Sequence, residues 1–262
     1  MSKEYVQKPG DTYVQSFARG LAVLRSFGAE APAQTLTDVA ARTGLTRAGA
    51  RRILLTLHSL GYVSSEGRLF RLTPKVLELG FAYLRSLPVW SQAQPVMEEL
   101  VHDLRQSSSA AVLDGDEIVY VLRVPAHKIM SINLGLGSRL PAYCSSMGRV
   151  LLAGLPPKQL KERVQAMVLE PYTPATIVDP GQLLTAIAQV REQGWCIVVE
   201  ELEPGLVSLA APVRDHSGRV VAAINISGHA KSMTPEHLQS TCLPKLLEAA
   251  SRINMLMGAM PA

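Results

Sequence analysis

The chain has 262 residues, of which 47% are hydrophobic, 18% charged and 5% aromatic. This length suits one large domain or two modest ones, and the apolar content is enough for a core, which excludes a largely disordered protein. The net charge of +4 is by itself too small to imply a nucleic-acid partner.

The charge is distributed unevenly along the chain. Residues 1–75 hold 11 Lys and Arg against 5 Asp and Glu, a net charge of +6, whereas residues 76–262 hold 15 against 17, a net charge of −2. Eight of the eleven N-terminal cations are Arg, whose planar guanidinium suits phosphate and base contacts. The asymmetry predicts a basic, DNA-binding module joined to a near-neutral module with another task.

The first segment, residues 1–12, has no apolar run, so we expect a flexible, exposed N-terminus rather than a signal peptide. No stretch reaches the ~18 apolar residues of a membrane span. Cys144, Cys196 and Cys242 lie far apart and form no Cys-x-x-Cys pair, which argues against a disulfide framework or a zinc ribbon. We therefore expect a reduced, cytoplasmic protein that needs no membrane, metal or cofactor.

A first helix is predicted between Ser16, its expected N-cap, and Gly28, which stops it. The apolar residues that carry the three- and four-residue spacing are Phe17, Leu21, Leu24 and Phe27.

A helix-turn-helix is predicted next. One helix covers residues 35–43, and Gly44 permits a tight turn after it. A second helix begins at the cap residue Thr46 and ends at Leu60. Residues 62–72 alternate around a glycine turn and predict two short strands, a β-wing. Residues 13–73 are therefore predicted to be a winged helix-turn-helix DNA-binding domain.

The arginines of this module are the expected DNA contacts. The second helix of the motif would reach base edges or phosphates, and the wing would reach phosphates or the minor groove. The candidate DNA-binding residues are Arg42, Thr46, Arg47, Arg51, Arg52, Arg68 and Arg71. The alternative for any single arginine is a solvent-facing side chain or an ion pair with Asp38 or Glu66.

A fourth helix is predicted over residues 74–88, since Thr73 can cap it and Pro74 suits its first turn. It is amphipathic and lies between the two modules, so we interpret it as a linker helix that also carries dimer contacts. Packing against its own domain alone is the alternative.

The second module, residues 89–262, is predicted to be α+β with a curved antiparallel sheet, because hairpins alternate with grouped helices. The predicted helices cover residues 95–106, 145–152, 156–168, 180–193 and 235–256, and the predicted strands cover 110–113, 117–123, 131–134, 195–199, 207–213 and 220–227. With helices on one side, such a sheet leaves a pocket for a small ligand on the other.

The second module offers little for catalysis. Its histidines do not have the spacing of a metal site. Cys144 or Cys196 could pair with a distant histidine as a nucleophile, but neither lies in a recognisable nucleophile motif, and a buried core thiol is the expected role. We therefore predict no catalytic residues, no metal site and no enzyme.

Uncharged polar residues interrupt the apolar strands and suit a small organic acid, which needs hydrogen-bond donors but no chemistry. These residues are Ser145, Ser146, Ser208, Asn225 and Ser227, with Arg139 as an additional candidate for a carboxylate fork. Alternatively, Ser208 and Ser227 bond only to neighbouring backbone.

Three stretches, residues 16–24, 38–47 and 205–215, resemble the IclR-type transcriptional regulators. Three more, residues 112–115, 139–143 and 146–153, are most similar to the PcaR, PcaU and PobR group of that family. These regulators control the breakdown of protocatechuate, 4-hydroxybenzoate and related acids through the β-ketoadipate route. The resemblance covers the chain from about Tyr13 to the C-terminus.

The resemblance implies a GAF-like effector-binding domain and a homodimer or dimer of dimers on a palindromic site in double-stranded promoter DNA. The family's ligand-lining positions fall on Ile129, Ile132, Leu140, Ser146, Met147, Val198, Leu206, Ser208, Asn225 and Ser227. The family often has an acidic or hydroxyl residue where Val198 stands, although Glu201 keeps its place. This departure suggests a more apolar acid, such as one with a ring.

The expected function is thus a ligand-responsive activator or repressor of aromatic-acid catabolism genes, with an aromatic or dicarboxylic effector such as 4-hydroxybenzoate, protocatechuate or β-ketoadipate. The alternatives are a constitutive DNA-binding protein without a ligand, and an enzyme that acts on the bound acid.

Overall fold

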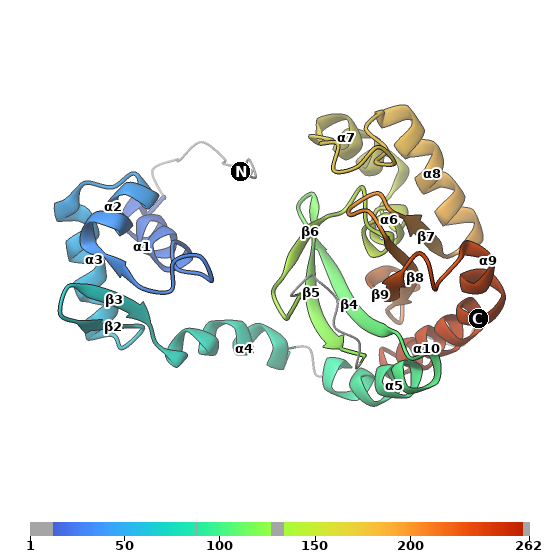
Figure 1. Ribbon diagram of the computed structural model, residues 1–262, viewed down its shortest axis with the longest axis horizontal. Coiled ribbons are helices and arrows are strands. Elements are labelled where there is room, and N and C mark those ends of the chain that lie inside the picture. The colour runs from blue at the N-terminus through green and yellow to red at the C-terminus, as the bar shows by residue number, and fades with distance from the viewer. Residues whose placement is uncertain (1–12, 87–88, 127–133, 259–262) are drawn as a thin grey trace. The chain divides into compact units, whose positions relative to one another are not determined.

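The computed structural model describes residues 13–86, 89–126 and 134–258 and divides into two compact units, residues 1–86 and 87–262. Figure 1 shows a small helical unit with a short hairpin and a larger unit built on a sheet. Each unit has its own hydrophobic core.

The first unit is a winged helix-turn-helix. Its elements are α1 (Gln15–Arg25), β1 (Gln34–Thr35), α2 (Leu36–Thr43), α3 (Arg47–Ser59), β2 (Val63–Glu66), β3 (Leu69–Leu72), a 3-10 turn (Pro74–Val76) and α4 (Leu77–Ser86). Its core joins residues of the first three helices and the wing, among them Val23, Val39, Leu54 and Val63.

Local sequence sets the boundaries of the helix-turn-helix. Thr35 caps α2 through a capping box with Asp38, and Thr46 caps α3 by accepting a hydrogen bond from the Gly49 amide. Gly44 ends α2 with a φ of 66°, a left-handed conformation that costs glycine little. The predicted helix-turn-helix and the two wing strands are confirmed.

The start of α1 and the strand β1 differ from the predictions for this unit. The N-cap of α1 is Val14, and Ser16 lies within the helix. Phe17 and Leu21 remain 67% and 42% exposed, because the core reaches only the C-terminal half of α1, where Val23 is fully buried. The two-residue strand β1, which pairs with β3, was missed because it is too short to show a periodic pattern.

The second unit is a sheet flanked by helices (Figure 1). Its elements are α5 (Val89–Leu104), β4 (Ser107–Asp114), β5 (Glu117–Val124), β6 (Arg139–Pro141), α6 (Ser146–Ala153), α7 (Pro157–Ala166), α8 (Pro180–Gln193), β7 (Cys196–Val199), β8 (Leu206–Arg214), β9 (Val220–His229), α9 (Pro235–His237), a π-helical turn (Leu238–Cys242) and α10 (Leu243–Leu256). The six strands form one antiparallel sheet in the order β6-β5-β4-β9-β8-β7.

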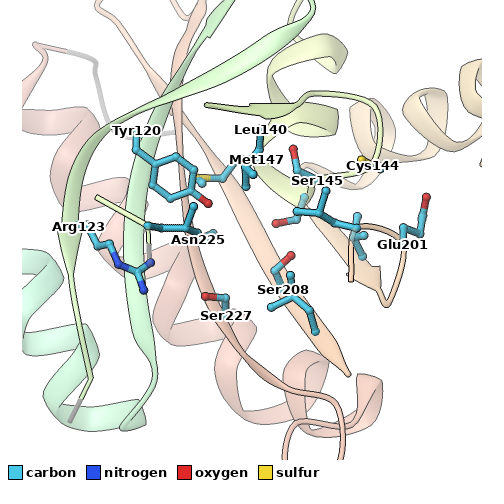
Figure 2. Close-up of a pocket in the computed structure, with 15 residues that line it drawn as sticks. Tyr120, Arg123, Leu140, Cys144, Ser145, Met147, Glu201, Ser208, Asn225 and Ser227 are labelled. Atoms are coloured by element: carbon cyan, nitrogen blue, oxygen red, sulfur yellow. The ribbon is translucent and has the colours of Figure 1, made fainter. Parts of the chain in front are cut away.

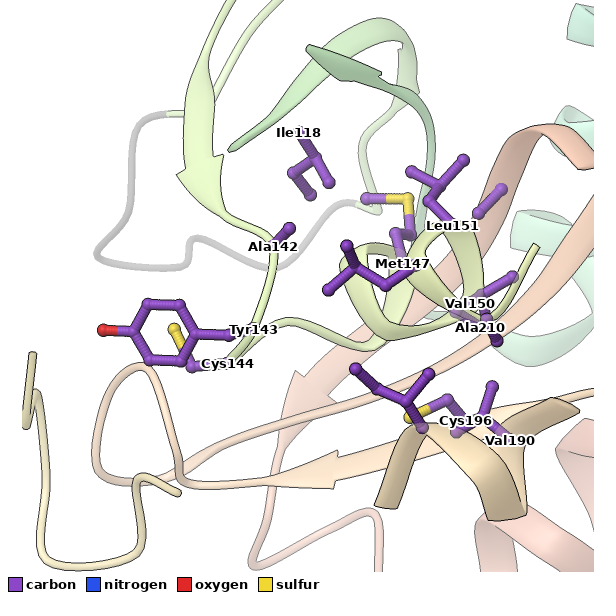
Figure 3. Close-up of a cluster of buried hydrophobic side chains, with 14 of the residues drawn as sticks. Ile118, Ala142, Tyr143, Cys144, Met147, Val150, Leu151, Val190, Cys196 and Ala210 are labelled. Atoms are coloured by element: carbon purple, nitrogen blue, oxygen red, sulfur yellow. The ribbon is translucent and has the colours of Figure 1, made fainter. Parts of the chain in front are cut away.

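Helices cover both faces of this sheet. Helices α5 and α10 pack together on one face, while α6 packs on the other and is in turn covered by α8. Figure 3 shows the core between α6 and the sheet, with Met147 and Val150 of the helix near Ala210 of β8. The expectation that helices cover one side only was therefore wrong.

Some predicted boundaries also differ. The helix predicted from Pro95 begins at Val89, because burial of Trp90 and Ala93 fixes its first turns although the proline lacks an N–H. The predicted C-terminal helix is interrupted by the π-helical turn, and the three-residue strand β6 was missed. Residues 131–133 of the predicted strand 131–134 lie outside the described residues.

Candidate functional site

The first candidate site is the arginine-bearing surface of the first unit. Helix α3 buries Ala50, Leu54 and Leu57 against the core, so its remaining faces point to solvent. All seven predicted DNA-binding residues are exposed: Arg42, Thr46, Arg47, Arg51, Arg52, Arg68 and Arg71. They come from the end of α2, the first half of α3 and the wing.

In the described part of the chain, no ion pair within 4.0 Å includes any of these arginines, although Arg42 lies near enough to Asp38 for their charges to interact. The Asp38 carboxylate instead accepts hydrogen bonds from the backbone and side chain of Thr35, which hold the pKa of Asp38 below its ordinary value. The alternative of ion pairs with Asp38 or Glu66 is therefore not what the structure shows. That these residues contact DNA stays a prediction.

The second candidate site is a cavity between the sheet and α6 that is partly open to solvent (Figure 2). Eight predicted effector-binding residues line it: Leu140, Ser146, Met147, Val198, Leu206, Ser208, Asn225 and Ser227. Ile129 and Ile132 lie outside the described residues. The lining also includes Ser145, one of the polar residues singled out in the sequence, and six residues that were not predicted to bind the effector: Tyr120, Arg123, Leu134, Cys144, Glu201 and Leu202.

The polar groups of β8 and β9 converge because of strand register. Ser208 lies directly opposite Ser227, and Asn225, two residues before Ser227, points to the same face. Asn225 accepts a hydrogen bond from the Ser109 amide through its Oδ1 at 3.1 Å. Within the described residues, the hydroxyls of Ser208 and Ser227 make no hydrogen bond, contrary to the alternative that they bond to neighbouring backbone.

Ser146 at the start of α6 has a buried hydroxyl without a hydrogen-bond partner. Its side chain lines the cavity, it is only 1% exposed, and its Oγ has no hydrogen-bond partner among the described residues. A buried hydroxyl without a hydrogen-bond partner destabilises the fold by about 1–3 kcal/mol, so most buried polar groups form a hydrogen bond with the protein or with ordered water. A polar group of a bound molecule would remove this cost.

A β-bulge in β5 turns Arg123 toward the cavity. Along β4 and β5, Ala110 pairs with Leu122 but Ala111 pairs with Tyr120, so Val121 is an extra residue in β5. Strict alternation would put Tyr120 and Arg123 on opposite faces, whereas after the bulge both line the cavity. The Arg123 Nη1 donates to Ser109 Oγ at 3.2 Å, which leaves other guanidinium N–H groups for a ligand.

Arg139, the predicted carboxylate fork, does not line the cavity. Its Nε donates to Glu117 Oε2 at 2.7 Å, and its Nη2 donates to Asp114 Oδ2 at 2.8 Å. Two carboxylates therefore already hold the guanidinium at the edge strand β6. This expectation is corrected: the arginine that faces the cavity is Arg123.

A buried ion pair between Arg149 and Glu201 lies at the side of the cavity formed by Glu201. Arg149 of α6 donates to the Tyr143 carbonyl at 2.8 Å and to the Glu201 carboxylate, and the two side chains are 5% and 9% exposed. The same carboxylate oxygen accepts the Ile177 amide at 3.2 Å. Figure 2 shows Glu201 and Arg123 on opposite sides of the cavity, so with Glu201 neutralised by its partner the local charge of the cavity is positive.

The two cysteines considered as nucleophiles lie in the core around α6 (Figure 3). Burial raises the pKa of both the Cys144 and the Cys196 thiol to about 12, so neither forms an appreciable amount of thiolate near neutral pH. Among the described residues, no group of three His, Cys, Asp or Glu side chains is arranged to hold a metal ion. No helix in the same residues is long and apolar enough to cross a membrane.

Both units of the chain are similar to domains of known proteins. Two family models match the chain: the IclR helix-turn-helix domain over residues 16–67, and the C-terminal domain of the bacterial transcriptional regulator IclR over residues 81–255. The Pca regulon regulatory protein of Pseudomonas putida is 44% identical over 241 residues, which are 92% of this chain and 82% of that protein.

Two further similar proteins have hydroxybenzoate in their descriptions. The p-hydroxybenzoate hydroxylase transcriptional activator of Acinetobacter baylyi is 34% identical over 251 residues, which are 94% of this chain and 93% of that protein. The crystal structure of an IclR homologue from Microbacterium hydrocarbonoxydans, complexed with 4-hydroxybenzoate, is similar with a TM-score of 0.81 and 27% identity, over 94% of this chain and all of that one.

Proposed function

Because the chain belongs to the IclR family of bacterial transcriptional regulators, we propose that it is a ligand-responsive regulator of genes for aromatic-acid catabolism. The observation that carries the proposal is the cavity, which is lined by Arg123 and by the unpartnered hydroxyl of Ser146, in a chain whose other unit exposes the arginines of α3 and the wing. The similarity to regulators named for the Pca regulon and for p-hydroxybenzoate hydroxylase supports the choice of genes.

The chemistry of the cavity favours an aromatic hydroxy acid. Arg123 would bind the carboxylate through a charge-assisted hydrogen bond, and a ring would lie against Leu140 and Met147. Ser146, with its unpartnered hydroxyl, would bond to a phenolic group. Protocatechuate and 4-hydroxybenzoate have this combination, and β-ketoadipate is the aliphatic alternative.

The proposed domain roles follow the two units. Residues 13–73 would bind a palindromic promoter site, residues 89–262 would bind the effector, and the segment 74–88, which contains α4, would transmit the change between them. A homodimer or dimer of dimers would place two α3 helices in half-sites about 34–36 Å apart, or a multiple of it. An effector that binds one spacing better shifts the population toward it. We expect this regulator to act in the cytoplasm.

Arg123→Gln is predicted to weaken the binding of 4-hydroxybenzoate about 10- to 100-fold, since a hydrogen bond to a charged group is worth about 1.5–3 kcal/mol. Isothermal titration calorimetry on the full-length protein measures this change. Arg105→Gln, which removes an exposed arginine of the same unit outside the cavity, should leave the affinity unchanged.

Ser146→Ala gives an independent check of the same site. Removing an unpartnered buried hydroxyl should leave the melting temperature unchanged or raise it, while the affinity for 4-hydroxybenzoate falls. A parallel loss of stability would give Ser146 a structural role instead. If 4-hydroxybenzoate, protocatechuate and β-ketoadipate all fail to raise the melting temperature of the wild type, the effector proposal is wrong and a constitutive DNA-binding protein remains.

Arg51→Ala is predicted to weaken specific DNA binding by about 1–3 kcal/mol for each bidentate base contact that is lost. A gel-shift titration against a palindrome beside the protein's own gene, at several salt concentrations, measures this effect. Lys161→Ala removes an exposed cation from α7 in the other unit and is the matched control. An unchanged footprint for Arg51→Ala would contradict the role of this arginine.

A further inference from the structure

A polar row crosses three neighbouring strands of the sheet on the face that borders the cavity. Ser109 of β4 lies directly opposite Arg123 of β5 on one side and directly opposite Asn225 of β9 on the other. Residues directly opposite each other in a sheet point to the same face, so Ser109 shares the face on which Arg123 and Asn225 line the cavity. Ser109 thus lies between two residues of the ligand site.

Ser109 itself is buried next to that site. It is 1% exposed, and it is not among the residues that line the cavity in the described part of the chain. Any effect of its side chain on a ligand therefore acts through a neighbour.

The Ser109 hydroxyl holds the guanidinium of Arg123. Its Oγ accepts a hydrogen bond from Arg123 Nη1 at 3.2 Å. An arginine side chain that is already held in place loses less rotamer entropy when a ligand binds. The acceptor is also neutral, and in the described residues no ion pair within 4.0 Å includes Arg123, so the guanidinium keeps its charge.

The contrast with Arg139 shows why a neutral acceptor matters. Two carboxylates hold the Arg139 guanidinium at 2.7 and 2.8 Å and compensate its charge. A hydroxyl opposite Arg123 gives a fixed position without that compensation. The cation is then left to a carboxylate of the ligand.

The backbone of Ser109 makes a separate contact with Asn225. The Ser109 amide donates to Asn225 Oδ1 at 3.1 Å, which leaves Nδ2 as the end of the Asn225 side chain that can donate to a ligand. Because this contact uses the backbone, replacing the Ser109 side chain leaves it in place. A Ser109 variant therefore removes the contact with Arg123 and keeps the contact with Asn225.

We propose that Ser109 is a positioning residue of the effector site, which holds the Arg123 guanidinium toward the cavity with its charge uncompensated. This role rests on the proposed function, because it takes a carboxylate as the group that Arg123 binds.

Isothermal titration calorimetry of the full-length protein tests this role with 4-hydroxybenzoate and its uncharged amide, 4-hydroxybenzamide. Ser109→Ala should weaken the binding of 4-hydroxybenzoate about fivefold to tenfold, since the hydrogen bond that orients the cation is lost. It should leave the affinity for 4-hydroxybenzamide unchanged, and it should cause no further loss in an Arg123→Gln background. A residue that only stabilises the sheet would not show this dependence on ligand charge and on Arg123.

Two controls separate the hydroxyl from packing. Ser108→Ala removes a buried hydroxyl from the same strand, but that hydroxyl lies on the opposite face and donates to the Asn225 carbonyl, so the affinity should not change. Ser109→Thr and Ser109→Val give side chains of the same shape, and only the first keeps the hydroxyl. Ser109→Thr should bind like the wild type and Ser109→Val like Ser109→Ala, and this pair decides the question if Ser109→Ala fails to fold.

Additive losses of affinity in Ser109→Ala and Arg123→Gln would contradict the proposal. Equal losses for the acid and the amide would do so too, as would a loss in Ser108→Ala as large as that in Ser109→Ala. If the wild type binds none of 4-hydroxybenzoate, protocatechuate and β-ketoadipate, the proposed function is wrong and the role of Ser109 falls with it. Binding by the wild type that Ser109→Ala leaves unchanged would contradict the role of Ser109 alone.

Discussion

Glu201→Leu is expected to lower the free energy of unfolding of the second unit by about 3–5 kcal/mol, because it leaves the buried Arg149 guanidinium without its counter-charge. The double variant Arg149→Met, Glu201→Leu should recover most of this loss, since an apolar pair of similar volume avoids the desolvation cost of both ions. Urea unfolding followed by tryptophan fluorescence measures the change in the correct unit, because the chain's two tryptophans, Trp90 and Trp195, both belong to it.

The double variant also separates stability from ligand binding. Glu201 lines the cavity, so a folded double variant with altered affinity for 4-hydroxybenzoate would show that the ion pair shapes the ligand site as well as the core. A single variant as stable as the wild type would mean that water reaches Arg149 and replaces its partner. That outcome would contradict the burial of the pair.

Gly148→Ala should cost about 3 kcal/mol or more, at the upper end of overpacking penalties. A Cβ at this position would come closer than 3.0 Å to the carbonyl oxygen, the Cα and the carbonyl carbon of Ala142. These are backbone atoms, so the strain cannot be relieved by a change of rotamer, and α6 would have to move away from the segment before it.

Gly135→Ala is the matched control, because a Cβ there meets nothing within 4 Å and the residue lies in the same unit. This control should leave the unfolding midpoint unchanged or raise it slightly. The two variants are compared by the same fluorescence-monitored urea titration. Equal stability of Gly148→Ala and the wild type would show that the contact between α6 and Ala142 is looser than the structure has it.

Much of the fold was predictable because local signals determine it. The cap residues Thr35 and Thr46 and the turn residue Gly44 set the helix-turn-helix boundaries, and α8 runs over the predicted residues 180–193. The polar residues of β8 and β9 were predictable as a group, since a strand places every second side chain on one face. Signals of this kind act over a few residues and are visible in one sequence.

The charged residues of the cavity could not be assigned in the same way. Arg139 was predicted as a carboxylate fork from its place just before Leu140 and Pro141, but its partners Asp114 and Glu117 are more than twenty residues away and only the strand pairing brings them close. The pairing of Arg149 with Glu201 spans an even longer separation. No local pattern records such pairs, so identifying them needs the sheet order.

The bulge at Val121 has an evolutionary consequence. Deleting or inserting one residue in β5 would turn Arg123 to the other face of the sheet without changing any side chain of the cavity wall. The cavity would then lose its cation and suit uncharged compounds. Relatives that respond to neutral molecules are therefore expected to differ from this chain in the length of β5, a difference that comparing residue identities position by position would overlook.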